Sequence, residues 1–173
     1  QSYSMGSSFT LSQRQDANGN TGLITLSNTR FGTRSYQGDF TFYASGNTLT
    51  IVNTVYLETY LYGVVGNEMD NAWPLEALKA QAVAARTYAY MDMTGSGTYD
   101  IGDTTNDQVY KGYRASDDVV MRAVNETAGM ILTYNGQPFV TYYAASNGGE
   151  TDTPAHIWSD RVSPGCYVVK EDP

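Results

Sequence analysis

Apolar and polar residues alternate through the first third of the chain. The alternation is clearest over residues 21–56, where Gly and Asn interrupt the apolar positions. A period of two places successive side chains on opposite faces of a sheet, so this part predicts antiparallel strands. Residues 1–20 are polar and end in an Ala-Asn-Gly-Asn turn, which indicates a frayed end or the first arm of a hairpin.

The period changes to a helical one at residue 56. Apolar residues recur every three or four positions over residues 56–65, and we expect Gly66 to stop this helix. Residues 115–129 form another helical segment, in which Ser116 is the expected cap and Gly129 lies past the end.

The best-defined helix lies between these two. We expect Asp70 or Asn71 to cap it and Pro74 to lie in its first turn, where the missing N–H costs nothing. Its apolar stripe consists of Leu75, Leu78, Ala82, Ala85 and Ala89. Gln81 falls within this stripe and Arg86 on its edge. A buried amide needs partners, so Gln81 either braces a neighbouring loop or points into a cleft.

The C-terminal third predicts a hairpin and a long loop. The hairpin covers residues 130–146 around an Asn-Gly turn, and the loop covers residues 146–160. Residues 107–113 fit a strand or a turn. We therefore predict an α+β fold with a cleft, in which antiparallel strands and hairpins pack around the long Ala-rich helix and a shorter one. We expect residues 1–173 to form a single domain, or two small lobes, of a polypeptide that continues past residue 173.

The charge balance excludes a nucleic-acid partner. The 173 residues include 18 acidic and 10 basic ones, the formal net charge is -8, and the basic residues do not cluster. A phosphate backbone is bound by clustered Lys and Arg. Only 16% of the residues are charged, and 15 Tyr stand against 5 Phe. Tyrosine stacks on sugar faces and bonds sugar oxygens, so the composition suits carbohydrate, although tyrosine also suits strands.

Histidine and cysteine are too few for a metal site. His156 and Cys166 are single, whereas a closed zinc site takes four ligands. His156 also lacks an acid in a recognisable triad order. We therefore expect no metal and no cofactor.

No stretch reaches the roughly 18 apolar residues of a membrane helix. No charged and then apolar leader opens the chain, so in an exported protein the signal would lie outside it.

One acid stands out by its position. Glu68 follows the apolar run 56–65, and we expect it just outside the N-terminus of the long helix. The helix dipole would hold it ionised there, whereas a general acid must retain its proton through apolar burial. The sequence leaves both roles open. The loop acids available as a second carboxylate, as in common glycosidases, are Asp103, Asp107, Glu150, Asp152 and Asp160.

Four stretches together resemble one protein family. They are "LYGVVGNEM…WPLEALKAQAVAARTYA", "TTNDQVYKG", "AVNETAGMILTYNGQPFVTYYAASNGGET" and the Trp that follows. The first is long and specific. On these motifs, residues 36–173 are identified as a member of the stage II sporulation protein D family, which also contains the amidase enhancers of bacterial cell walls.

The resemblance implies an exported domain that binds peptidoglycan in the bacterial cell wall. Sporulation members are lytic transglycosylases, which cleave peptide-stripped glycan strands between N-acetylmuramic acid and N-acetylglucosamine and leave 1,6-anhydro ends. The family's catalytic acid maps to Glu68. Arg86 would meet the lactyl carboxylate of muramic acid or form a structural salt bridge. The residues expected to bind the glycan are Gln81, Arg86, Gln108, Tyr110, Ser146, Gly148 and Gly149.

Two departures from the family pattern bear on function. Ala144 stands where relatives often have a histidine, and some relatives use histidine and cysteine around this loop to hold zinc, so the alanine again predicts no bound metal. Gly66 and Asn67 replace the more usual Pro-Ser before the acid.

Two rival functions remain open. One is a non-catalytic enhancer that binds wall glycan and stimulates an amidase, and the other is a hydrolase that uses water and a loop acid.

Overall fold

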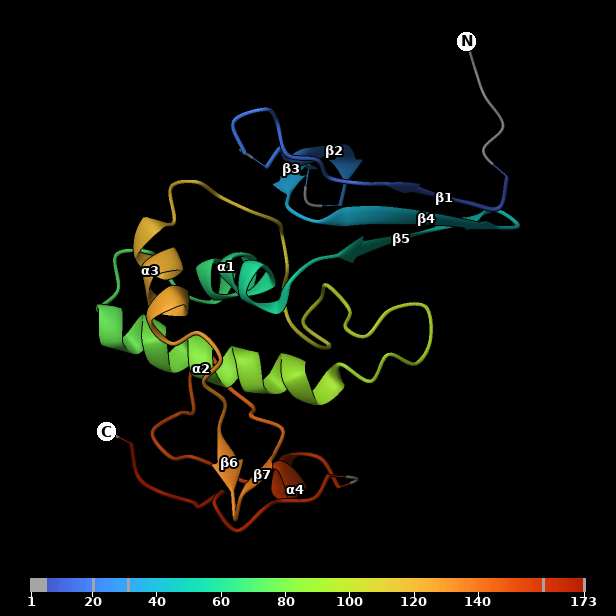
Figure 1. Cartoon of the computed structure of the whole chain (residues 1–173). Helices are drawn as coiled ribbons and strands as arrows, with labels where there is room; N and C mark the ends of the chain where they lie inside the picture. The colour runs from blue at the N-terminus through green and yellow to red at the C-terminus, as the bar shows by residue number, and fades with distance from the viewer. Residues whose placement is uncertain (1–5, 20, 31, 160, 173) are drawn as a thin grey trace.

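The first third of the chain folds into strands, which form the upper layer in Figure 1. The computed structural model describes residues 6–19, 21–30, 32–159 and 161–172. The strands are β1 (Ser8–Leu11), β2 (Ile24–Thr29), β3 (Gly32–Tyr36), β4 (Asp39–Ser45) and β5 (Thr48–Thr54). One antiparallel sheet has the order β1-β4-β5, and β2 and β3 form a separate antiparallel pair. The predicted antiparallel strands are thus confirmed.

The polar N-terminal residues contribute one strand to the larger sheet. β1 pairs with β4, with Phe9 opposite Phe42, and the two rings stack at 4.6 Å. A bridge between Gln15 and Thr21 closes the predicted turn region. Residues 1–5 and the last turn residue, 20, lie outside the described residues.

Three helices pack together below the sheet and form the core. They are α1 (Leu57–Glu68), α2 (Leu75–Asp92) and α3 (Asp118–Glu126). Fully buried residues of these helices are Leu61, Val64, Val65, Leu78, Ala82, Ala85, Ala89, Val120, Ala123 and Val124. Four of the five predicted stripe residues of α2 belong to this set, and Leu75 is partly buried. The small alanine side chains let α1 and α3 approach α2 closely.

The predicted stop at Gly66 is wrong, because α1 continues to Glu68. Gly66 serves close packing instead. A Cβ there would clash with the Asp117 carboxylate, and the Gly66 carbonyl accepts a hydrogen bond from Arg114. Gly63 has the same role one turn earlier, because a Cβ there would lie 2.6 Å from the Tyr110 ring.

The predicted caps are also wrong. α2 begins after Pro74 without a side-chain cap, and Asp70 accepts the Ala72 N–H in the preceding turn. Asn71 instead binds α3, since its side-chain oxygen accepts the Val120 N–H at 3.0 Å. Asp117, rather than Ser116, is the residue before α3. The side chain that precedes α2 in sequence therefore hydrogen-bonds to α3, which packs against α2.

The part of the chain that contains β6, β7 and α4 lies below α2 in Figure 1 and is mostly irregular. It contains β6 (Thr133–Tyr134), β7 (Gln137–Pro138) and α4 (Pro154–Ile157). The predicted turn is confirmed, with positive φ at Asn135 and Gly136. The arms are shorter than expected because Pro138 lacks an N–H and the flanking residues bind α2. The region predicted as a loop contains α4.

The helices and antiparallel strands confirm the α+β prediction. The single domain and the cleft beside Glu68 stay predictions. In the described part of the chain, no helix combines the length and the apolar character that crossing a bilayer requires.

Candidate functional site

Glu68 is the last residue of α1, so the expected position outside a helix N-terminus is wrong. The difference reverses the electrostatic argument, because the C-terminal end of a helix dipole disfavours a carboxylate. The residue is exposed overall, yet burial of its carboxyl raises its pKa above the ordinary value. A hydrogen bond from the Val109 N–H and the charge of Lys111 partly oppose this rise. Glu68 therefore tends to keep its proton while staying accessible.

The partners of Glu68 come from the extended segment 108–112, which follows the loop after α2 (Figure 1). Its residues alternate strictly: Gln108, Tyr110 and Gly112 are buried, whereas Val109 and Lys111 are partly exposed. The segment was expected to be a strand or a turn, and it has strand-like alternation without strand pairing. One face fills the core beside α1, and the other face meets Glu68.

Gln108 connects three parts of the fold. Its side-chain nitrogen donates to the Ala85 carbonyl of α2 at 3.1 Å and to the Tyr143 hydroxyl at 3.0 Å. Its side-chain oxygen accepts from the Tyr60 hydroxyl of α1 at 3.2 Å. Gln108 was expected to bind sugar, but the structure buries it with each end of its amide engaged.

Tyr110 is also mostly buried. Its hydroxyl donates to the Asn53 side chain at 3.0 Å, and its ring lies 4.8 Å from the Tyr60 ring and 5.8 Å from the Tyr36 ring. These contacts join α1 to the strand layer. A direct contact of Tyr110 with sugar stays a prediction.

Arg86 forms the structural salt bridge that the sequence left open. Its guanidinium makes a two-pronged ion pair with Glu58 of α1, at 2.9 and 2.7 Å, and only 1% of its side chain is exposed. The remaining donors reach the Val124 and Met130 carbonyls at 3.1 and 3.2 Å, with Thr127 nearby. Arg86 thus ties α1, α2 and the end of α3 together, and it faces the core rather than a cleft.

Gln81 is partly buried on α2. Its amide nitrogen does not brace a neighbouring loop, which was one of the two roles predicted for it. That atom is buried and has no hydrogen-bond partner among the described residues. A role of Gln81 toward a ligand stays a prediction.

The expected Ser-x-Gly-Gly loop is exposed. The Ser146 hydroxyl accepts the Gly148 N–H at 3.2 Å, and both glycines have positive φ, 70° and 99°. Gly149 accepts a hydrogen bond from Asp172, which holds the loop to the C-terminal residues. The loop follows Tyr143 by three residues, and its contact with a ligand stays a prediction.

The described residues hold no group of three or more His, Cys, Asp and Glu side chains that could bind a metal ion. His156 does have an acid partner, which the sequence did not suggest. Its Nδ1 lies 2.8 Å from Asp152, four residues earlier, and the histidine side chain is 80% exposed. Cys166 is exposed and free.

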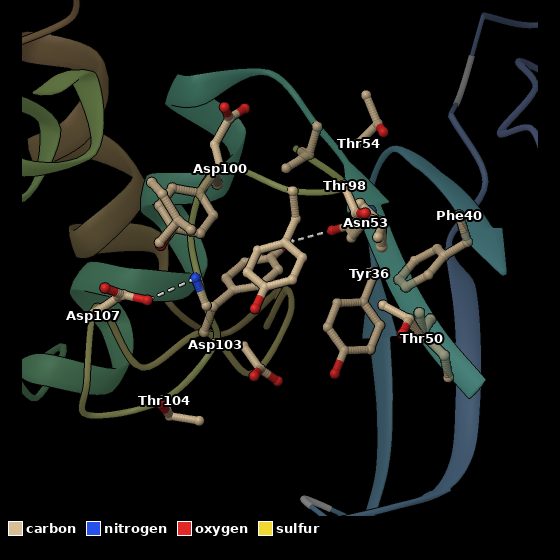
Figure 2. Close-up of a pocket in the computed structure, with 18 of the residues that line it drawn as sticks. Tyr36, Phe40, Thr50, Asn53, Thr54, Thr98, Asp100, Asp103, Thr104 and Asp107 are labelled. Atoms are coloured by element: carbon tan, nitrogen blue, oxygen red, sulfur yellow. Dashed lines mark hydrogen bonds between the residues drawn. The ribbon is translucent and has the colours of Figure 1, made fainter. Parts of the chain in front are cut away.

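A hollow of about 660 Å³ lies between β5 and the loop after α2 (Figure 2). Tyr36, Phe40 and Asn53 lie on one side, and Asp100, Asp103 and Asp107 on the other. Arg30 is the basic residue on this lining, and it forms an ion pair with Asp103. Glu68 does not line this hollow. This hollow and the Glu68 site are therefore different places. The acidic wall of the hollow disfavours a polyanionic ligand.

The carboxylates of Asp103, Asp107 and Asp152 have partners other than Glu68. Asp107 accepts the Gly102 N–H at 2.9 Å, and Asp152 binds His156. Glu150 bridges to Glu171 through the backbone, and Asp160 lies outside the described residues. Among the described residues, the charged side chain that shifts the pKa of Glu68 is Lys111.

Sequence reasoning missed Lys111 and Tyr143. The charge of Lys111 lowers the pKa of Glu68. Burial, together with the charge of Glu68, raises the pKa of Tyr143. The alternation over residues 108–112 could have identified Lys111, because it lies on the face opposite Gln108 and Tyr110. No local signal points to Tyr143, which follows Glu68 by 75 positions in the sequence.

The family assignment rests on the helices and segment described above. A family model described as "Stage II sporulation protein" matches residues 45–134, which is more than half of the chain. The chain belongs to this family. The match includes α1, α2, α3 and the segment 108–112, so it covers Glu68 and Lys111.

Three relatives are much longer than the part that aligns with this chain. The amidase enhancer of Bacillus subtilis (strain 168) is 48% identical over 112 residues, 65% of this chain and 15% of the relative. The stage II sporulation protein D of the same organism is 33% identical over 128 residues, 64% of this chain and 37% of the relative. An uncharacterized protein of Brachyspira hyodysenteriae is 39% identical over 130 residues, 73% of this chain and 35% of the relative. The chain thus spans between 15% and 37% of these relatives' lengths.

Proposed function

We propose that the chain is a lytic transglycosylase domain that cleaves peptide-stripped peptidoglycan strands outside the bacterial cytoplasm. The observation that carries this proposal is the carboxyl of Glu68, which is accessible and yet has a raised pKa. A general acid needs both properties, because it must reach the substrate and arrive protonated.

Glu68 would act twice in the proposed reaction. It first gives its proton to the glycosidic oxygen between N-acetylmuramic acid and N-acetylglucosamine as the bond to the anomeric carbon breaks. The resulting carboxylate then takes the proton of the muramic acid 6-hydroxyl, whose oxygen bonds to the anomeric carbon. The product carries a 1,6-anhydro ring, and Glu68 is protonated again. No water enters, so one carboxyl is sufficient.

The surroundings of Glu68 support this reaction over hydrolysis. An inverting hydrolase needs a second carboxylate to activate water, and a retaining one needs a carboxylate nucleophile. The carboxylates of three described loop acids, Asp103, Asp107 and Asp152, each have another partner. Lys111 beside Glu68 is the cation positioned to meet a lactyl carboxylate, a role that the buried Arg86 does not fit. Gln81 and the loop with Ser146, Gly148 and Gly149 are the remaining candidates for glycan contacts.

The second candidate function is a non-catalytic enhancer that binds wall glycan and stimulates a cell-wall amidase. The observation that favours it is the 48% identity to the amidase enhancer of Bacillus subtilis. In that case the chain would hold the same glycan at the same site without cleaving it, and the amidase would be a protein partner.

Mass spectrometry of digested, peptide-free glycan separates these functions. Anhydro-ended fragments support the transglycosylase, fragments with reducing ends indicate a hydrolase, and intact strands that nevertheless bind the protein indicate the enhancer. Glu68→Gln keeps the shape of the side chain and removes the titrating proton, so cleavage is expected to stop while binding persists. Glu76→Gln is the matched control, because Glu76 is an 82% exposed glutamate on α2. Equal cleavage by wild type and Glu68→Gln would refute the assignment of the acid.

A further inference from the structure

Tyr143 links the buried Gln108 to the surroundings of Glu68. Its hydroxyl accepts a hydrogen bond from Gln108 at 3.0 Å, and the charge of Glu68 adds to burial in raising the pKa of that hydroxyl. Gln108 and Val109 are adjacent, and the Val109 N–H binds the Glu68 carboxyl. Tyr143 and Glu68 are therefore held by neighbouring residues of one short segment.

The direction of the hydrogen bond between Gln108 and Tyr143 is fixed by chemistry. The Ala85 carbonyl can only accept, so the atom of Gln108 that lies 3.1 Å from it must be the amide nitrogen. The Tyr60 hydroxyl satisfies the amide oxygen on the other side. The second N–H of Gln108 therefore donates to Tyr143, and the Tyr143 hydroxyl is the acceptor. Its own proton must point to a different acceptor.

The charged and titratable neighbours of Tyr143 indicate where that proton goes. They are Glu68 at the end of α1, Tyr88 on α2 and Tyr60 on α1. Burial raises the pKa of the Tyr143 hydroxyl, so it remains protonated and can act as a donor near neutral pH. Tyr60 already donates to Gln108, which leaves the Glu68 carboxylate as the strongest acceptor in this group.

We propose that Tyr143 is the positioning residue of the Glu68 acid, and that its O–H is donated to the carboxylate of Glu68 once the proton has left. Its catalytic part rests on the proposed function, whereas the contact itself does not. The bond is stronger to the ionised carboxyl than to the neutral one, so it stabilises the state reached when the glycosidic oxygen has been protonated more than it stabilises the resting acid. Gln108 holds the phenol in this orientation, which gives a buried glutamine a role without contact to sugar.

The contact is tested by titration, without any cleavage assay. NMR of ¹³C-labelled glutamate measures the pKa of Glu68, whose other charged neighbour is Lys111. Tyr143→Phe removes a donor to the charged form, so the pKa of Glu68 is expected to rise. Tyr142→Phe is the matched control, because Tyr142 packs against Trp158 and is the next residue in the chain. It is expected to leave the pKa of Glu68 unchanged.

Wild-type protein provides a measurement that does not depend on folding of a variant. The ¹³Cζ signal of Tyr143 is expected to shift with the midpoint of the Glu68 titration and to lose that step in Glu68→Gln. In the cleavage assay, Tyr143→Phe is expected to lower kcat about tenfold with KM nearly unchanged, as for the loss of one hydrogen bond of ordinary strength. The basic limb of its pH profile moves upward with the pKa of Glu68.

Two results would overturn the proposal. One is a Glu68 pKa that is the same in wild type and folded Tyr143→Phe, and the other is a Tyr143 signal that ignores the Glu68 titration. An inactive wild-type domain would refute the proposed function instead, and the two titrations would still decide whether Tyr143 donates to Glu68.

Discussion

Replacing Arg86 by methionine is expected to destabilise the fold without removing a glycan contact. Methionine keeps most of the length and the apolar stem of arginine but has no donors. The change removes both guanidinium hydrogen bonds from the Glu58 carboxylate, which keeps the one from the Gly129 N–H, and it removes donors from the Val124 and Met130 carbonyls. The perturbation therefore acts where three helices meet.

The size of the effect follows from burial. Removing one partner of a buried, hydrogen-bonded ion pair costs about 3–5 kcal/mol. Glu58 is 34% exposed, so water partly solvates it after the change and the lower end, about 3 kcal/mol, applies. For a chain of this length, each kcal/mol lowers Tm by about 2–4 °C, which gives a loss of about 6–12 °C.

The assay combines thermal unfolding with glycan binding. Arg122→Met is the matched control, because its ion pair with Glu126 lies on the exposed face of α3 and is expected to leave Tm nearly unchanged. Binding of peptide-free glycan well below Tm is expected to be the same for wild type and Arg86→Met. The reasoning is refuted if Arg86→Met melts like wild type and loses glycan binding, since Arg86 would then serve the ligand.

Two further predictions concern α1. Gly63→Ala is expected to cost about 1–3 kcal/mol, because the new Cβ would lie 2.6 Å from the Tyr110 ring, and urea unfolding beside a harmless Gly22→Ala control would show it. Glu68→Gln is expected to be more stable than wild type at pH 7. The raised pKa means that folding favours the protonated form, so wild-type stability falls as pH rises from the unfolded to the folded pKa of Glu68. Urea unfolding at pH 4 and 7 checks this, and a variant less stable than wild type at pH 7 would contradict it.

The sequence predicted the elements better than their ends. The stripe Leu78, Ala82, Ala85 and Ala89 is fully buried, because helical periodicity reflects the face turned to the core. The caps failed for a different reason. Asn71 precedes α2 in sequence but binds the first turn of α3, and this use depends on how the helices pack.

The candidate site was predictable only in part. Glu68 was found through family motifs, but it was expected before the N-terminus of α2 and instead ends α1. The error arose because Gly66 resembles a helix stop in the sequence, whereas in the structure it allows close packing. Arg86 pairs with Glu58, which is 28 positions away, and no local pattern distinguishes that pairing from a ligand contact. Such contacts are set by tertiary structure.

The extended segment 108–112 explains why motif residues and site residues differ. Its period of two sends Gln108, Tyr110 and Gly112 into the core, while the Val109 N–H and the charge of Lys111 act on the Glu68 carboxyl. The glycine at position 63 is what lets this segment lie against α1. A motif that reads as "QVY" therefore combines two functions, because the residues that look polar and functional hold the segment in place while the intervening ones reach the carboxyl. On this geometry, exchanging Lys111 alters the Glu68 site directly, whereas exchanging Gln108 alters it only through Tyr143 and the position of the segment.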